Sequence, residues 1–397
     1  MTIDQAPLPS EGQAQPAQQQ REPALGVGHR AYGLLLFVAI GMGIVAVVVS
    51  KALDEPLRDP DGFLGPAWVR LPAMVAAAFL IDVIPRTIWR SYRNRNGLIS
   101  EGKRLLAEHW TRNRIACVAI GLTSFYVTYV SYRNLKNGLL IYHGKTQDQW
   151  LHKMDQFLLF GHEPATLMHS VLGENLWAHI LATVYLIFLP IAPMSVVIWL
   201  VWSRQLSEGY WYVTANCLCW TLGTISYYMI PSLGPGFAYP WLYTDLAHTG
   251  VTDLLNGLWN GRYAGAYNPF ADGVQSVAGF ASLHCAIILC IALVAHYTVR
   301  TRLIRLILWV FFALTVMSTV YFGWHYLADV FAGCLIAVVS VWIAGLATEQ
   351  RFIPAARQAA AERSSAAVAG EPVDAADAEG PANTADTLDV AGTEATH

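Results

Sequence analysis

The amino-acid sequence predicts an all-α fold: a helical bundle that crosses a membrane about eight times and carries interfacial helices on its outer side. Of the 397 residues, 55% are hydrophobic and only 13% are charged, whereas water-soluble domains carry about 25% charged residues. The apolar residues also gather in runs close to the roughly 20 residues that a helix needs to cross the hydrocarbon core. This composition excludes an ordinary soluble domain, and the sequence has no basic stretch typical of nucleic-acid binding.

Eight apolar runs are long enough to span a bilayer, and the segment 135–172 is amphipathic instead. That segment includes MDQFLLFGHEPATLMHSVL and predicts helices that lie along the interface, or a re-entrant piece. Arg70 and Asp82 make the second run the most polar of the eight. The predicted spans are 31–50, 68–85, 114–131, 176–202, 210–230, 277–299, 306–323 and 325–347.

The chain divides into four predicted parts. Residues 1–29 and 351–397 are polar, Ala-rich segments without periodic hydrophobic residues, which predicts disordered tails. Residues 30–130 hold the first transmembrane helices and a basic cytoplasmic loop, and residues 131–350 form the core that carries the chemistry. We interpret the first apolar run as a membrane anchor, because a long polar segment precedes it and further spans follow. The excess of arginine over lysine, 20 to 5, indicates a bacterial source.

The distribution of basic residues predicts the orientation. The loop between the second and third runs has eight Arg and Lys residues, from Arg86 to Arg114, against Glu101 and Glu108, which indicates the cytoplasmic side. Counting spans from this loop puts both termini inside the cell. The loops 132–175 and 231–276 and the turn at His325 then face the outside, as expected for a multi-pass plasma-membrane protein with its site on the extracytoplasmic side.

All six cysteines lie in apolar runs, so we expect buried hydrophobic side chains and no disulfide framework. Cys217 and Cys219 have C-x-C spacing, but no second pair follows at the spacing of a zinc site. The six are Cys117, Cys217, Cys219, Cys285, Cys290 and Cys334.

The stretch YFGWHYLADVFAG places His325 and Asp329 four residues apart, on one face of a helix that would otherwise suit lipid. An ionisable side chain at membrane depth costs roughly 2.5 to 3.5 kcal/mol on insertion scales, so such groups usually have a function. His284 precedes His325 by one helical hairpin. The chain crosses the membrane twice between them, which predicts two imidazoles facing each other at one depth.

Two histidines and a carboxylate suit phosphoryl transfer. A histidine whose second ring nitrogen donates to a carboxylate is held in one tautomer and becomes a better nucleophile. A second histidine across a small gap can protonate a leaving oxygen. The residues therefore favour a covalent phosphohistidine, with a membrane lipid phosphate as the substrate.

The motifs ASLH at 281–284 and HYLAD at 325–329 resemble two signatures of the type-2 phosphatidic acid phosphatase superfamily. The form S-L-H, and H-Y-x-x-D-x-x-x-G ending at Gly333, resemble its inositol phosphorylceramide synthase branch. The resemblance implies that His325 is the nucleophile, Asp329 its orienting partner and His284 the acid for the departing alkoxide. It also implies that no metal and no organic cofactor take part.

The sequence departs from the superfamily where many members have phosphate-binding cations. Thr319 stands at a position that is usually Arg, and the first-motif region IPSLGPGF has no cation. Phosphate still needs positive charge or hydrogen-bond donors. We expect these from Arg133 and Lys136 in SYRNLK, from Arg262, with Lys145 as a further possibility, and from the helix start at Ser282.

Three functions remain open at this stage. The favoured one is a metal-independent lipid phosphatase or phosphotransferase, with water, inositol, a sugar or a lipid alcohol as the acceptor. The alternatives are a proton-coupled transporter that uses His284, His325 and Asp329 as a relay, and a metal-dependent enzyme whose two His and one Asp bind iron. The lipid and the oligomeric state do not follow from the sequence.

Overall fold

The computed structural model describes residues 29–59, 67–142, 145–203, 205–267, 279–350 and 352–354. The contacts within the chain define two units, residues 1–352 and residues 353–397. The first unit contains every described helix. The predicted disordered tails lie almost entirely outside the described residues.

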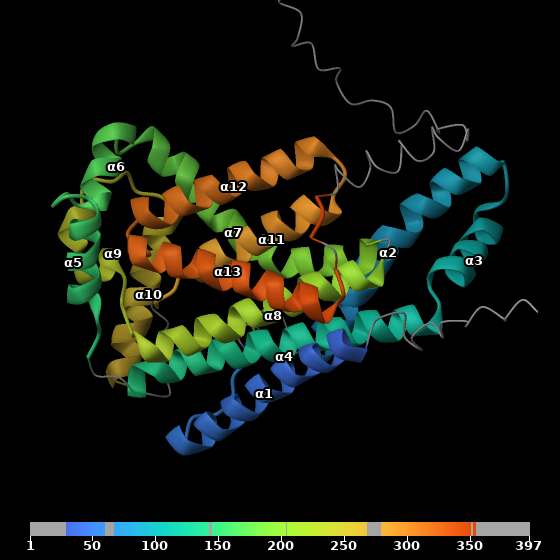
Figure 1. Ribbon diagram of the computed structural model, residues 1–397, viewed down its shortest axis with the longest axis horizontal. Coiled ribbons are helices and arrows are strands. Elements are labelled where there is room, and N and C mark those ends of the chain that lie inside the picture. Colours follow the sequence, from blue (N-terminus) through green and yellow to red (C-terminus); the bar gives the residue numbers. More distant parts are fainter. Residues whose placement is uncertain are drawn as a thin grey trace, which may run out of the picture. The chain divides into compact units, whose positions relative to one another are not determined.

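Every secondary-structure element of the described residues is helical, so the predicted all-α helical membrane bundle is confirmed (Figure 1). Each of the eight apolar runs contributes a helix, and shorter helices occupy the loops between them. The elements are α1 (His29–Leu53), α2 (Ala67–Asn94), α3 (Leu98–His109), α4 (Arg112–Tyr142), α5 (Asp148–Leu158), α6 (Pro164–Leu172), α7 (Leu176–Trp202), α8 (Leu206–Met229), α9 (Pro235–Ala238), η2 (Pro240–Tyr243), α10 (Gly250–Tyr267), α11 (Leu283–Thr298), α12 (Arg302–Tyr321) and α13 (Leu327–Ala347).

Five of the described helices are long and apolar enough to cross a membrane, fewer than the eight spans expected. The other three expected runs form α2, α8 and α11, and α11 is apolar but has only 16 residues. The five candidate spans are Tyr32–Leu53, Arg112–Leu139, Leu176–Trp202, Arg302–Tyr321 and Leu327–Ala347.

The position of α8 explains its polar composition. This helix packs against α1, α4, α7, α11 and α13, and it is buried without interruption from Gly209 to Trp220. Its polar side chains bond to one another: the Asn216 amide donates to the Tyr212 hydroxyl at 3.0 Å, and the Trp220 indole N–H donates to Asn216 Oδ1 at 2.8 Å. Because these groups are paired and shielded from lipid, the bundle tolerates them at its centre.

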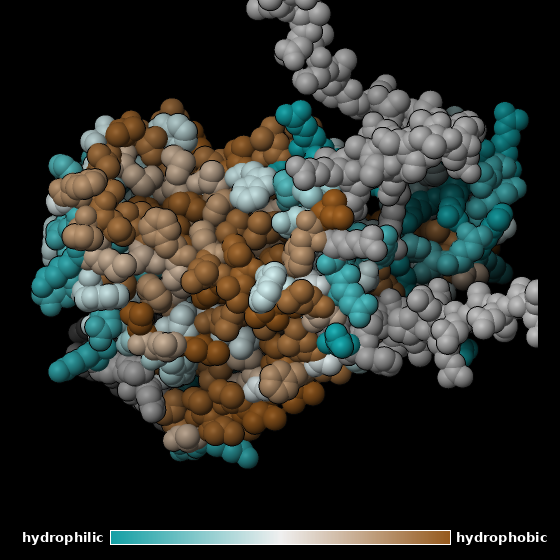
Figure 2. All heavy atoms as spheres, in the orientation of Figure 1, coloured by the Kyte–Doolittle hydropathy of each residue, from teal (hydrophilic) through white to brown (hydrophobic). Residues whose placement is uncertain are grey.

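Large apolar side chains lie on the outside of the bundle. Phe37, Phe331 and Leu335 are each more than 60% exposed, which suits a surface surrounded by lipid tails. Figure 2 shows hydrophobic residues over much of the helical bundle and hydrophilic residues gathered toward its ends. The surface therefore supports integration in a membrane.

The two ends of the bundle differ in structure. At one end, Arg114 at the start of α4 donates to the carbonyl oxygens of Val201, in the last turn of α7, and of Ser203, directly after it, next to the basic α2–α3 region. At the other end, α4 continues to Tyr142 and is followed by α5 and α6, so the segment predicted to be interfacial begins with the last turns of α4. The turn between α12 and α13 lies at this second end, where α5 bonds to the start of α13.

Candidate active site

His325 sits in a tight turn between α12 and α13. The carbonyl oxygen of Thr319 accepts the backbone N–H groups of Trp324, at 2.9 Å, and of His325, at 3.3 Å. Gly323 completes the turn at φ +67°, a conformation that side-chain-bearing residues rarely adopt. Thr319, at the position where Arg is often found in the superfamily that the motifs resemble, is fully buried. It stabilises the turn through its main-chain carbonyl group.

Asp329 orients the imidazole of His325. Nδ1 of His325 lies 3.2 Å from Oδ2 of Asp329, and the same oxygen accepts the backbone N–H of Tyr326 at 3.1 Å. With Asp329 ionised, the carboxylate can only accept, so this geometry places the ring proton on Nδ1 and the lone pair on Nε2. Burial lowers the pKa of His325 to about 3, and the positive charge of Lys136 acts in the same direction. A neutral imidazole with a free Nε2 is the form that a nucleophile needs.

His284 faces His325 from the start of α11. The two ring centroids lie 5.8 Å apart, as the helical-hairpin spacing predicts. Two aromatic rings of α7 hold the imidazole of His284: Tyr185 stacks on it with centroids 4.7 Å apart, and Phe188 contacts it at 4.3 Å. His284 has no hydrogen-bond partner among the described residues. Its nitrogens are therefore available to a substrate.

Lys136 brings a positive charge to the two histidines. Its Nζ lies 5.8 Å from the ring centroid of Tyr132 and 5.3 Å from that of Tyr227, and aromatic faces stabilise a cation at such distances. The ammonium group is close enough to act electrostatically on both His284 and His325. Of the predicted phosphate-binding cations, Lys136 is the one that the described structure associates with the histidines.

The other predicted phosphate-binding residues lie differently. Arg133, one turn earlier on α4, forms no hydrogen bond or ion pair among the described residues. Ser282 is fully buried and caps α11, where its hydroxyl accepts the backbone N–H of Cys285 at 3.4 Å. Lys145 is exposed, and the side chain of Arg262 lies outside the described residues.

Two buried carboxyl groups of α5 also border the site. Asp148 accepts the backbone N–H groups of Leu233 and Gly234 and the hydroxyl of Tyr326, and Asp155 accepts the backbone N–H of Leu327. The sequence KMDQFLLFG places Asp155 in a stretch that resembles an interfacial D-x-x-L-F-G element of the inositol phosphorylceramide synthase branch, but a helix-start charge explains it equally well, so neither Asp155 nor Asp148 is among the predicted site residues. The sequence feature that could have identified them is their spacing of seven residues, which places both side chains on one face of α5.

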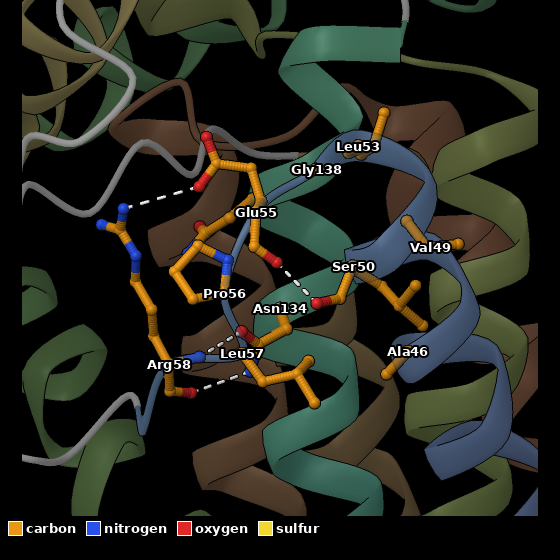
Figure 3. A pocket seen from close by; sticks show the side chains of 12 residues that line it. Ala46, Val49, Ser50, Leu53, Glu55, Pro56, Leu57, Arg58, Asn134 and Gly138 are labelled. Atoms are coloured by element: carbon orange, nitrogen blue, oxygen red, sulfur yellow. Dashed lines mark hydrogen bonds and ion pairs between the residues drawn. The ribbon is translucent and has the colours of Figure 1, made fainter.

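A small pocket opens beside His325. Residues of α5, α6, α9, η2 and the α12–α13 turn line it, among them His152, Asp155, Glu163, Tyr243 and His325. A second pocket lies between the end of α1, residues 55–58 and α4, and it contains neither histidine (Figure 3). We take the pocket at His325 as the access route for a polar reactant.

The proposed iron site requires three ligands around one point. In the described parts of the chain, no group of three or more His, Cys, Asp and Glu side chains is arranged to hold a metal ion. The six cysteines form no disulfide bond with one another, and five of them are buried.

The architecture and the site together define a helical membrane protein with two facing histidines, one of them paired with a carboxylate. Residues 149–343 match the family model of the PAP2 superfamily, and this segment includes His284, His325 and Asp329. The match supports the superfamily that the two motifs resemble, and this superfamily implies phosphatase or phosphotransferase activity on phosphate esters. Comparison with curated proteins and with solved structures finds no match.

Proposed function

We propose that the protein is a lipid phosphatase or phosphotransferase that works through a phosphohistidine, without a metal. The observation that carries this proposal is the arrangement of three side chains: His325 bonded through Nδ1 to Asp329, with the ring of His284 5.8 Å away. The match of residues 149–343 to the PAP2 superfamily supports the phosphate-ester substrate. The apolar surface of the bundle supports a lipid as the molecule that carries the phosphate ester.

The reaction has two steps. Nε2 of His325 attacks the phosphorus atom and forms an N–P bond, while the P–O bond to the lipid alkoxide breaks and protonated His284 gives its proton to the departing oxygen. Water or a hydroxyl compound then attacks the phosphorus. His284 removes the proton of this nucleophile, and the N–P bond breaks to restore His325. Asp329 holds the ring in the required tautomer throughout.

Lys136 supplies the positive charge that the phosphoryl oxygens need. It takes the place of the cation missing at Thr319 and lies half-buried over the rings of Tyr132 and Tyr227, where electrostatic interactions are stronger than in water. Arg133 and Arg262 are secondary candidates, as are the backbone donors at Ser282. The small pocket beside His325 gives the water or hydroxyl acceptor its route to the phosphorus.

The proposed setting is the plasma membrane, with the site on the extracytoplasmic side and both termini in the cytoplasm. The basic residues from Arg86 to Arg114 support this orientation through the positive-inside rule. The forms S-L-H and H-Y-x-x-D-x-x-x-G support the inositol phosphorylceramide synthase-like branch, which favours transfer to a hydroxyl acceptor.

A direct test uses the purified protein in detergent with EDTA and a panel of labelled phosphatidic acid, phosphatidylinositol and polyprenyl phosphate. Each lipid is offered with and without inositol, and free phosphate is followed against newly formed lipid. We expect turnover of at least one lipid in EDTA. We expect His325→Ala to abolish it, with helicity and elution volume unchanged.

One lysine variant and one arginine variant test the contact with the phosphate. Lys136→Met should lower kcat/KM by about 100-fold or more, as expected for the loss of an electrostatic donor, whereas Arg133→Met should change it only a few-fold. No turnover of any lipid by the wild-type protein would favour a transporter. Turnover that EDTA removes would favour a metal enzyme.

A further inference from the structure

Helix α5 buries carboxyl groups and exposes large aromatic side chains, the reverse of what a helix on a water-exposed surface does. Asp148 and Asp155 face the protein and are only 6% and 2% exposed, while Trp150 and Phe157 point outward and are 53% and 83% exposed. Burying a carboxyl group is costly unless hydrogen bonds compensate. The partners of these two groups therefore indicate what the helix does.

Asp155 binds the first turn of α13. Both of its oxygens lie 3.0 Å from the backbone N–H of Leu327, and Oδ1 also lies 3.4 Å from that of Ala328. The first N–H groups of any helix lack partners within the helix. An acidic residue at the third position of a helix commonly turns back to accept such a group, and here that residue is Asp329.

The donors at this helix start are shared between two carboxyl groups. Asp155 accepts the backbone N–H groups of Leu327 and Ala328, while Oδ2 of Asp329 accepts the backbone N–H of Tyr326 and lies 3.2 Å from the ring Nδ1 of His325. Oδ1 of Asp329 is buried and has no hydrogen-bond partner among the described residues, so the contribution of Asp155 is to fix the first turn of α13, from which Asp329 reaches the imidazole.

Asp148 completes the attachment of α5 to the histidine turn. Its Oδ1 accepts the hydroxyl of Tyr326 at 3.0 Å, and the same carboxyl group accepts the N–H groups of Leu233 and Gly234. The residue directly after His325 is thus fixed at its side chain by Asp148 and at its main chain by Asp329. Asp148 and Asp155, two turns apart on α5, thus bond to neighbouring residues at the start of α13.

We propose that Asp155 is a positioning residue: it caps α13 from a separate helix and thereby keeps Asp329 directed at His325. The role rests on the proposed phosphohistidine function, and Asp148 assists it from the same face of α5. Asp155 also lines the pocket beside His325, but in this scheme it contacts neither the phosphorus nor the departing oxygen. It acts through the geometry of Asp329.

The test compares Asp155→Ala, Asp155→Asn and Lys153→Ala. The alanine variant loses the acceptor, the asparagine variant keeps one acceptor oxygen, and Lys153 is an exposed residue of the same helix. We expect Asp155→Ala to lower kcat by about 100-fold with little change in KM, because small misplacements of catalytic groups have such effects. Asp155→Asn should recover at least a tenth of the wild-type kcat, and Lys153→Ala should match the wild type.

A second readout does not require turnover. Diethyl pyrocarbonate modifies neutral histidine, and mass spectrometry of the peptide containing His325 gives the rate of its reaction in each variant. We expect about a five- to thirtyfold faster reaction of His325 in Asp155→Ala, as the loss of a helix cap loosens the turn. Asp155→Asn and Lys153→Ala should react at the wild-type rate.

Wild-type kcat and wild-type His325 reactivity in Asp155→Ala would overturn the proposal, and so would an equal loss in the alanine and asparagine variants. If Asp155→Ala fails to fold, Asp155→Glu takes its place, since it moves the carboxyl group by one methylene and should lower kcat in the same way. If the wild-type protein turns over no lipid, the proposed function fails, while the His325 reactivities still decide the role of Asp155.

Discussion

Gly333 allows α11 and α13 to approach each other more closely than a side chain permits. A Cβ atom at this position would clash with the carbonyl oxygen of Ser282, and the backbone N–H of Ser282 donates to the carbonyl oxygen of Asp329 at 2.9 Å. The start of the helix that carries His284 therefore lies directly on the helix that carries Asp329. The final glycine of H-Y-x-x-D-x-x-x-G has this packing role.

We expect Gly333→Ala to destabilise the protein by about 1 to 3 kcal/mol, the usual cost of forcing an extra methyl group into a packed contact. Activity should fall at least tenfold, because moving Ser282 also moves His284 relative to Asp329. Thermal unfolding in detergent and the lipid assay measure the two effects.

Gly41→Ala is the matched control for this substitution. Gly41 is also a helical glycine, but a Cβ atom there would meet nothing within 4 Å. The helix propensity of alanine predicts a gain of about 0.5 to 1 kcal/mol. If both variants unfold at the same temperature, the proposed close contact at Gly333 is wrong.

The titration of Asp155 on α5 makes the stability of the folded protein depend on pH. Burial raises the pKa of this carboxyl group from 3.8 to about 7, the charges of Asp329 and Glu163 raise it further, and the hydrogen bonds from Leu327 and Ala328 oppose the shift. The folded protein thus keeps a proton on Asp155 at pH values where the unfolded chain has lost it. The stability that this proton contributes is complete below about pH 4 and is lost as the pH rises through 7.

We expect the wild type to lose about 2 kcal/mol of stability relative to Asp155→Asn between pH 5 and pH 8, since one unit of pKa shift corresponds to about 1.4 kcal/mol. The asparagine side chain does not titrate, so subtracting its stability cancels the contributions of all other groups. Melting temperatures of both proteins at pH 5, 6, 7 and 8 give this difference. A difference that does not vary with pH would show that Asp155 keeps an ordinary pKa.

The bundle as a whole has one basic end and one end with the histidines. Arg114 bonds to main-chain carbonyl groups at the end of α7 at the first end, and α5 and α6 cover the turn of His325 at the second. The helices α4 and α7 run between these ends, so the proposed orientation places the two ends on opposite sides of the membrane. We propose, from the positive-inside rule, that the histidine end faces outward.

Cysteine labelling tests this orientation. Lys153 on α5 and Lys103 on α3 are both exposed, so Lys153→Cys and Lys103→Cys present thiols at opposite ends. We expect a membrane-impermeant maleimide to label Lys153→Cys on intact cells, and Lys103→Cys only after permeabilisation. The wild type, whose cysteines are buried or half-buried, measures the background. The reverse pattern would place the site in the cytoplasm.

The sequence by itself determined the helical class, the apolar runs that form the long helices, and the facing of His284 and His325. These features depend on the length of apolar runs and on the four-residue spacing of a helix, which are local properties. The polar helix α8 has the length for a span without the expected hydropathy, because it is buried in protein without interruption from Gly209 to Trp220.

Only the tertiary structure decided which of the predicted cations lies near the histidines and which carboxyl groups bond to the start of α13. Arg133 and Lys136 lie one turn apart on α4, and the rotation of that helix in the bundle brings Lys136 between Tyr132 and Tyr227 near the histidines. Likewise, Asp155 accepts a hydrogen bond from the backbone N–H of Leu327, which lies 172 residues later in the chain. A hydrogen bond needs its atoms within about 3 Å, and such a distance between remote segments depends on how the helices pack against one another.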